Sequence, residues 1–80
     1  MKRFVATFHT HLSALLTDRA LKEQGIPSRM MPVFRKLSSS CGTCVVYEAE
    51  EPRLSLLDED VEGVYEIVGE EEYALLFQNE

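Results

Sequence analysis

The spacing of apolar residues changes abruptly in the first third of the chain, and this change constrains the fold more than any other feature. Phe4–Phe8 alternates in steps of two and is rich in aromatic and β-branched residues, which is typical of a β-strand. Within residues 12–24 the apolar side chains recur instead at steps of three and four, which predicts an amphipathic helix with Thr10 as its N-cap. Gly25 and Pro27 then end the helix. The chain is therefore expected to begin with a strand followed by a helix.

Three further segments have the composition of β-strands. Residues 29–33, 43–48 and 64–68 are rich in β-branched, aromatic and other apolar side chains. Pro32 removes a backbone donor, which indicates either the end of a strand or an edge strand. The connection between this strand and the next, residues 34–42, is predicted to be a loop.

Residues 50–60 are predicted to form a short second helix. Pro52 suits the first helical turn, and Glu50 and Glu51 lie where the positive end of the helix dipole favours negative charge. The last apolar segment, Tyr73–Phe77, fits a returning strand and a docked helical turn equally well.

The predicted order of elements is β-α-β-β-α-β with one additional terminal element. This order is typical of the split βαβ or ferredoxin-like arrangement, a two-layer α+β sandwich in which two helices cover one face of an antiparallel sheet. Eighty residues suffice for one such domain, spanning residues 1–80, and leave no room for a second. An apolar fraction of 45% and a charged fraction of 28% agree with a folded chain.

No segment of the sequence has the pattern of an export signal or of a membrane span. The apolar stretch that follows the basic residues Lys2 and Arg3 is short, and His9 and His11 interrupt it. Nothing approaches the roughly 18 consecutive apolar residues that a transmembrane helix needs. We therefore expect a cytoplasmic protein with no membrane partner. In that reducing compartment a pair of cysteines is more often redox-active, catalytic or metal-binding than a structural disulfide.

Charge is distributed very unevenly along the chain, whose formal net charge is −6. Residues 1–47 carry seven Lys or Arg and two carboxylates, a net charge of +5, whereas residues 48–80 carry one Arg and twelve carboxylates, a net charge of −11. This pattern fits a solvated acidic tail beside a mildly basic body, or a basic docking face for an anionic cargo or partner. The overall acidity and the lack of an RNA-binding signature argue against a nucleic-acid partner.

Cys41 lies in a polar segment that would be costly to bury. Arg35 and Lys36 precede it, and nearby positive charge favours the thiolate, which is the nucleophilic form of a cysteine. Gly42 follows it and is expected to supply a positive φ or a close approach to a partner. The hydroxyls of the serines before it are candidates for hydrogen bonds to a bound anion, although turn formation alone explains serines equally well; these residues are Ser38, Ser39 and Ser40.

Cys41 and Cys44 form a CxxC pair, which indicates either a dithiol redox pair or half of a zinc site. In a regular strand the odd separation places the two side chains on opposite faces, unless Gly42 forms a bulge, so a second reading is that Cys44 is a core residue. His9 and His11 share one parity and are nitrogen donors of the kind that zinc binds. Because the sequence holds no second CxxC, we expect no metal site.

Two stretches of the sequence resemble a known family. The first is Ala20–Pro27, and the more specific one is Pro32–Gly42, which carries the string P-x-x-R-x-L-S-S-x-C-G. These residues resemble the small bacterial proteins described as selenium/sulfur carrier-like, otherwise a domain of unknown function. The resemblance covers roughly residues 3–68. Phe34 stands where members often have a second proline, and Cys44 lies outside the string.

The resemblance implies that Cys41 carries a cargo atom and that Gly42 shapes its loop. The expected protein is a non-enzymatic carrier without a cofactor, which accepts sulfur or selenium on Cys41 as a persulfide-type adduct. The donor would be an enzyme such as a cysteine desulfurase, and the acceptor would be another protein. Two other functions fit the residues: a small interaction or regulatory domain with an exposed sheet edge and a structural Cys41, and a thiol-disulfide oxidoreductase that uses Cys44 as the second thiol.

Overall fold

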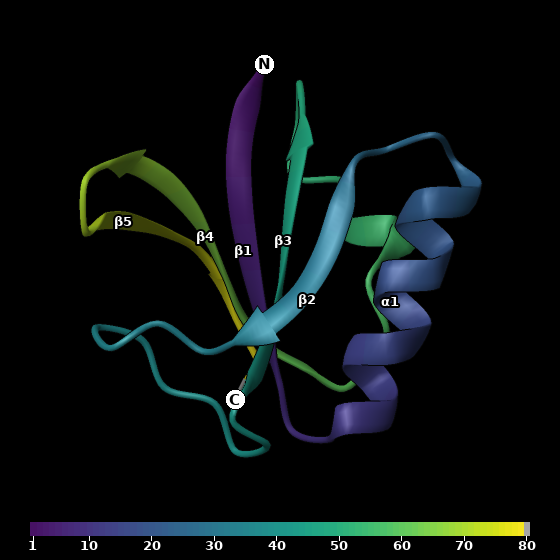
Figure 1. The fold of residues 1–80 in the computed structure, drawn as a ribbon, viewed down its shortest axis with the longest axis horizontal. Helices are drawn as coiled ribbons and strands as arrows, with labels where there is room; N and C mark the ends of the chain where they lie inside the picture. The colour runs from purple at the N-terminus through teal and green to yellow at the C-terminus, as the bar shows by residue number, and fades with distance from the viewer. Residues whose placement is uncertain (80) are drawn as a thin grey trace.

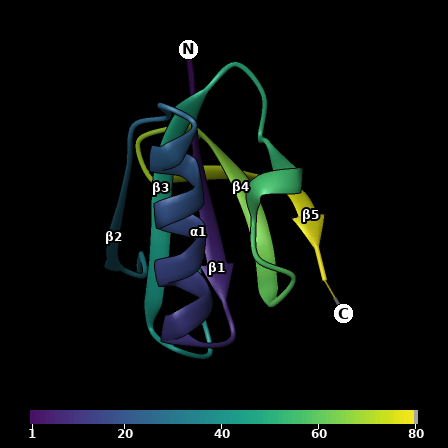
Figure 2. The same cartoon turned by 90° about the vertical axis from the view of Figure 1, so that its right-hand side faces the viewer.

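The structure, a computed structural model, describes residues 1–79 and shows an α+β fold. Within these residues one α-helix packs against one face of a five-stranded antiparallel sheet with strand order β2-β3-β1-β4-β5 (Figures 1 and 2). The elements are β1 (Lys2–Phe8), α1 (His11–Glu23), β2 (Ser28–Pro32), β3 (Thr43–Ala49), the 3-10 helix η1 (Leu54–Leu56), β4 (Val61–Gly69) and β5 (Glu72–Gln78).

The first strand and the helix form where the sequence predicts them. Thr10 has an extended backbone, and its hydroxyl accepts a hydrogen bond of 3.2 Å from the backbone N–H of Ser13, so the predicted N-cap is confirmed. At the other end Gly25 adopts a φ of +74°, and the amides of Gly25 and Ile26 donate to carbonyls of the last turn. This is a Schellman motif, which ends the helix before Pro27 as predicted.

The remaining strands agree with the predicted segments to within a few residues, and the ambiguous last segment is a strand. β5 pairs antiparallel with β4 and forms one edge of the sheet, while β2, which contains Pro32, forms the other edge. Residues 33–42 form the predicted loop between β2 and β3.

The predicted second helix does not form, so the prediction of a ferredoxin-like sandwich with two helices is wrong. Residues 50–60 contain only η1. Arg53 has a left-handed backbone, with φ 52° and ψ 48°, where the predicted helix would be in its first turns, and Leu57 is already extended. The acidic run Asp58–Asp60 would also lie at the negative end of the helix dipole, which disfavours further negative charge.

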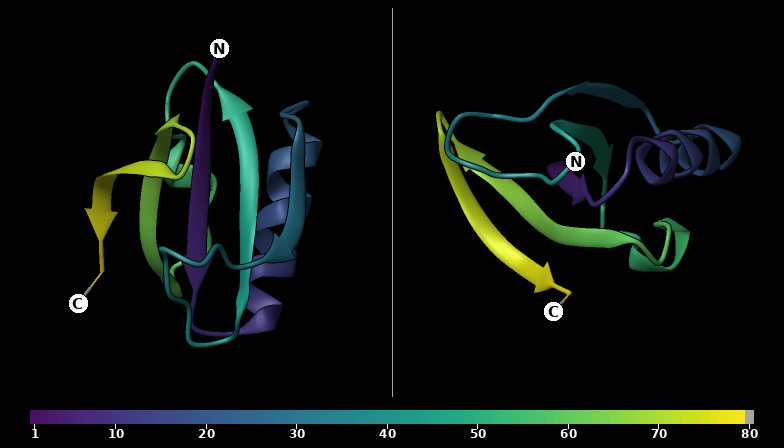
Figure 3. Two further views of the ribbon diagram at one scale, coloured as in Figure 1. Left: turned by 60° about the vertical axis from the view of Figure 1, so that its left-hand side comes forward. Right: turned by 90° about the horizontal axis from the view of Figure 1, so that it is seen from below.

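Each face of the sheet carries its own apolar cluster. On the helix face, alternate residues of β1 and β3, among them Phe4, Phe8, Val45 and Tyr47, pack in one cluster with Leu21 of α1. On the other face, Val5, Cys44 and Val46 are covered by Val33, Phe34 and Leu37 of the loop. The ring of Phe34 stacks on Tyr73 of β5 with centroids 5.7 Å apart. The 33–42 loop therefore covers the face that α1 leaves open (Figure 3).

Candidate functional site

The loop that carries Cys41 is made of two turns whose ends are joined. The amide of Val33 donates to the carbonyl of Gly42 at 3.1 Å and closes the loop. Within it, the amide of Leu37 donates to the carbonyl of Phe34 at 3.0 Å, and the amide of Gly42 donates to the carbonyl of Ser39 at 3.2 Å. Cys41 is the third residue of the second turn, which we call the cysteine turn (Ser39–Gly42).

Gly42 has the positive φ predicted for it, at +74°. A Cβ placed on this residue would meet no heavy atom within 4 Å. The backbone conformation, and not a shortage of space, therefore favours glycine at this position.

Ser39 anchors the cysteine turn to the end of the sheet. Its hydroxyl lies 2.8 Å from the carbonyl oxygen of Phe8 in β1 and 3.1 Å from that of Thr43 in β3, so its one proton is shared between two strand ends. The same hydroxyl lies 3.6 Å from the sulfur of Cys41, and this sulfur lies 3.6 Å from the carbonyl oxygen of Thr43. The predicted serine thus positions the turn that carries the thiol.

Glu62 of β4 is a residue of the site that the sequence did not indicate. Its two carboxylate oxygens accept hydrogen bonds from the amide and the hydroxyl of Ser40, at 2.8 and 2.9 Å. The carboxylate also lies 3.4 Å from Nδ1 of His9. A residue 22 positions away in the acidic half gives no local signal, because only the pairing of β4 with β1 brings it to this end of the sheet.

The basic residues and Ser38 remain at the surface of the loop. Arg35, Lys36 and Ser38 are exposed, and in the described part of the chain the polar contacts of the Cys41 sulfur are with Ser39 and Thr43. The two cations therefore contribute positive charge to the loop without touching the thiol.

A third cation, Arg29 of β2, is directed elsewhere. Residues that face each other across two strands lie on the same side of a sheet, and Arg29 is paired with Val46, which belongs to the cluster away from α1. Cys41 packs instead against the helix-side cluster. Arg29 is therefore not part of the surface around the thiol.

The two thiols lie in different environments. Cys44 is fully buried among Val5 and Val46, and its sulfur lies 3.7 Å from the carbonyl oxygen of Pro32. Burial raises the pKa of the Cys44 thiol to about 11, against a smaller lowering by a backbone hydrogen bond at Phe34. Cys41 is half-buried and contacts the other cluster, and both cysteines are free. The two cysteines therefore pack on opposite faces of the sheet, as their odd separation predicts, and Cys44 is a core residue.

His9 and His11, the candidate zinc ligands, contact oxygen atoms and not the sulfurs of the two cysteines. His9 lies against Glu62, as described above, and Nδ1 of His11 lies 3.4 Å from the hydroxyl of Thr43. Within residues 1–79, no three His, Cys, Asp or Glu residues come together as a set of metal ligands.

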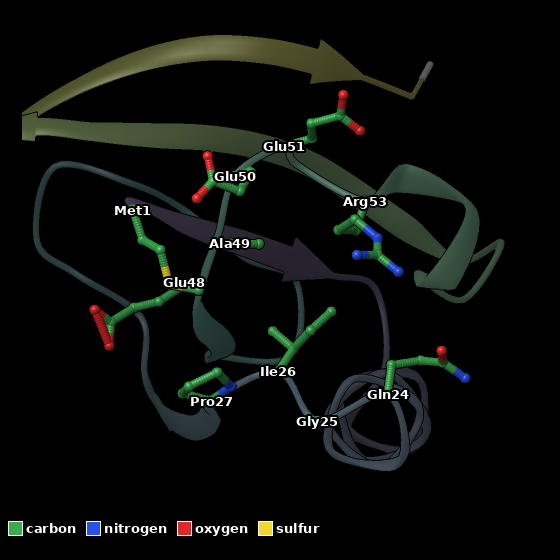
Figure 4. A pocket seen from close by; sticks show the side chains of 10 residues that line it. All are labelled: Met1, Gln24, Gly25, Ile26, Pro27, Glu48, Ala49, Glu50, Glu51 and Arg53. Atoms are coloured by element: carbon green, nitrogen blue, oxygen red, sulfur yellow. The ribbon is translucent and has the colours of Figure 1, made fainter.

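Two surface cavities lie away from the cysteine turn. One of about 320 Å³ opens at the opposite end of the sheet, between the end of α1 and the segment after β3, and Ile26 and Arg53 are among its lining residues (Figure 4). The other, of about 370 Å³, lies between η1 and the end of β5. Neither is lined by a residue of the 33–42 loop. The thiol therefore lies on a surface turn outside both cavities.

The fold and the site together define a class: a small α+β protein that presents one half-buried thiol on a turn closed by glycine. The chain belongs to the family described as "Putative Se/S carrier protein-like", whose family model matches residues 3–75. The match includes α1, the cysteine turn and most of β5, so the resemblance found in Pro32–Gly42 is confirmed. No curated protein and no solved structure matched the chain. Among the described residues, no helix has the length and apolar character needed to cross a membrane.

Proposed function

We propose that this protein is a sulfur or selenium carrier and that the sulfur of Cys41 is the atom that holds the cargo. The observation that carries the proposal is the contrast between the two thiols. Cys41 lies on a surface turn, whereas Cys44 is enclosed in the core with a raised pKa. Membership of a family described as selenium/sulfur carrier-like supports the same assignment.

The transfer step needs no external oxidant or reductant. The Cys41 thiolate attacks the outer sulfur of a persulfide on the donor, the donor's sulfur–sulfur bond breaks, and a new one forms on Cys41. The electron pair leaves with the donor's inner sulfur, which takes up a proton. Delivery reverses these roles: a nucleophile of the acceptor attacks the outer sulfur, and Cys41 leaves as the thiolate. Selenium would be carried in the same way, as a selenium atom bound to the Cys41 sulfur.

The residues around Cys41 position the thiol and leave it accessible. Ser39 and Glu62 hold the cysteine turn against the strand ends, and Gly42 provides its left-handed backbone. Because neither of the two cavities described above adjoins the turn, the partner would supply the proton-transfer groups, which fits a carrier better than an independent catalyst.

The surface cations and the compartment complete the proposal. Arg35 and Lys36, exposed in the first turn of the loop, would attract an acidic donor surface. A reducing cytoplasm would keep Cys41 available as a thiol between transfers. A cysteine desulfurase fits the donor, because it holds its product as a persulfide.

The test is transfer of labelled sulfur from a cysteine desulfurase to three proteins: the wild type, Cys41→Ser and Cys44→Ser. We expect Cys41→Ser to lose acceptance and Cys44→Ser to keep most of it, because serine preserves the volume and removes the nucleophile. Transfer should also be slower in about 1 M salt, where the screening length falls to about 3 Å. Full activity of Cys41→Ser would remove the carrier proposal, and equal loss in both variants would point to a dithiol oxidoreductase.

A further inference from the structure

β5 is an exposed edge strand, and its pairing with β4 shifts register at Leu76. Within residues 1–79 it pairs only with β4, so the backbone groups of its outer side have no partner strand (Figure 3). Leu75, Leu76 and Phe77 are 53%, 43% and 37% exposed. The strand contains no proline and no lysine, the residues that commonly block an edge, whereas the opposite edge strand, β2, is shorter and contains Pro32.

One residue of this exposed apolar set, Phe77, also lines a cavity. α1 packs on β1, β2 and β3, so it does not cover β4 and β5 (Figure 2). The cavity of about 370 Å³ lies in this uncovered region, between η1 and the end of β5. Its apolar walls include Leu54, Leu57 and Phe77, and Asp58 and Glu59 supply acidic groups. This volume lies at the lower end of the roughly 300–1,000 Å³ usual for ligand pockets.

The charge around β5 identifies the kind of partner that fits. Residues 54–79 carry eight carboxylates and no Lys, Arg or His. Glu70 and Glu71 form the turn before β5, and Glu72 is the first residue of the strand. These three acids lie at the opposite end of β5 from the acids of the cavity. A second copy of the chain would bring the same negative charges face to face, and an anionic partner would meet the same repulsion. A basic partner is therefore favoured.

We propose that β5 and the adjoining cavity form a docking surface for an extended, basic segment of a partner protein, which pairs with β5 as a sixth strand. Main-chain hydrogen bonds along the edge supply affinity, and one apolar side chain of the segment enters the cavity beside Phe77. Lysine or arginine residues flanking that side chain lie against Asp58 and Glu59 at one end and the Glu70–Glu72 turn at the other. This surface is distinct from the cysteine turn, so the inference does not depend on the carrier chemistry.

The test is an NMR titration of the ¹⁵N-labelled protein with the synthetic peptide Lys-Val-Thr-Leu-Val-Thr-Lys. We expect amide shifts concentrated in Glu72–Gln78 and the cavity walls. Affinity should fall about tenfold when the two lysines are replaced by glutamate, and by a similar factor in about 1 M salt, because both changes remove the charge attraction.

Matched variants locate the binding surface. Leu76→Lys places a cation on the edge strand and should weaken binding of the peptide about tenfold. Leu12→Lys makes the same substitution on α1, at a residue that is 62% exposed, and should bind as the wild type does. Cys41→Ser should also bind normally, so failure of the carrier proposal would not affect this result.

Several outcomes would overturn the inference. These are no shifts on titration, shifts that lie outside β5 and the cavity, or equal binding of the glutamate peptide. A concentration-dependent dimer in sedimentation, dissociated by Leu76→Lys, would assign the edge to a second copy of the chain instead.

Discussion

Cys41 and Cys44 lie only three residues apart in the sequence, yet their thiols differ in chemical reactivity. Cys44 is enclosed by apolar neighbours, where a charged sulfur cannot be solvated, and a pKa of about 11 leaves roughly one molecule in 10⁴ as thiolate at neutral pH. Cys41 lies on the turn, where reagents and partners can reach it. Reactivity at the residue scale is therefore set by how deeply each sulfur is buried.

The first prediction concerns the alkylation rates of the two thiols. With iodoacetamide at neutral pH, Cys41 should react more than about tenfold faster than Cys44, because only the thiolate attacks and Cys44 is both buried and protonated. Peptide mass analysis of timed samples measures both rates, and the two should converge in denaturant. Faster labelling of Cys44 would reverse the assignment.

A second prediction links the Cys44 thiol to stability at high pH. In the unfolded chain this thiol ionises at its ordinary pKa of 9.0, whereas in the folded protein it stays protonated up to about 11. Its contribution to the unfolding free energy is therefore complete below pH 9 and is lost as the pH rises towards 11. Between about pH 8 and pH 10 the wild type should lose about 1 kcal/mol more than Cys44→Ala does.

Denaturant melts at the two pH values supply this measurement. The same loss of stability in Cys44→Ala as in the wild type would show that Cys44 is not the titrating group.

At the scale of elements, the 33–42 loop has two structural tasks. Val33, Phe34 and Leu37 cover one face of the sheet, while the cysteine turn is fixed to the strand ends by Ser39 and Ser40. The stacking of Phe34 on Tyr73 connects the loop to β5. The apolar half of the loop thus holds in place the half that carries the thiol.

A third prediction compares two glycines that share the same positive φ. Gly25 and Gly42 both have a φ of +74°, and neither has a heavy atom within 4 Å of an added Cβ. Alanine at either position should lower the unfolding free energy by about 1 kcal/mol, the cost of a left-handed backbone for a residue with a Cβ. Only Gly42→Ala should also change the alkylation rate of Cys41 and its acceptance of sulfur. The same effect on both measurements in Gly25→Ala would contradict a local role for Gly42.

Sequence reasoning succeeded at the element scale where the signals are local. The capping by Thr10, the Schellman end at Gly25 and the parity of Cys41 and Cys44 each depend on a few neighbouring residues, and each was predicted. The helix predicted over residues 50–60 does not form: Arg53 has a left-handed backbone, and the acidic run that follows would lie at the negative end of the helix dipole, an unfavourable position that the apolar spacing and the N-terminal acids did not reveal.

The contacts of the site were harder to predict, because they join distant segments. Ser40 bonds to Glu62, and Ser39 bonds to Phe8 and Thr43. These bonds form only when the sheet brings the end of β1 and the starts of β3 and β4 to the same end of the sheet. The exposed edge at β5 likewise depends on the strand order, which no residue of β5 encodes alone.

Considered as a whole, the molecule has a basic part and an acidic part with different structural features. The basic part contains α1 and the cysteine loop, and the acidic part contains η1, β4 and β5. This division gives the two proposed surfaces opposite charge preferences. A donor with an acidic face would approach the cysteine turn, while a basic segment would bind at β5.

The central claim is that the sulfur of Cys41 holds the cargo, and the most direct measurement is to locate an added atom on the native protein. The wild type would be isolated without reductant from cells with an active cysteine desulfurase, and its intact mass and peptide masses recorded. We expect a fraction of the protein to carry one added sulfur or selenium atom, confined to the peptide that contains Cys41 and removed by a thiol reductant. An adduct on Cys44 alone, or protein that is entirely unmodified, would contradict it.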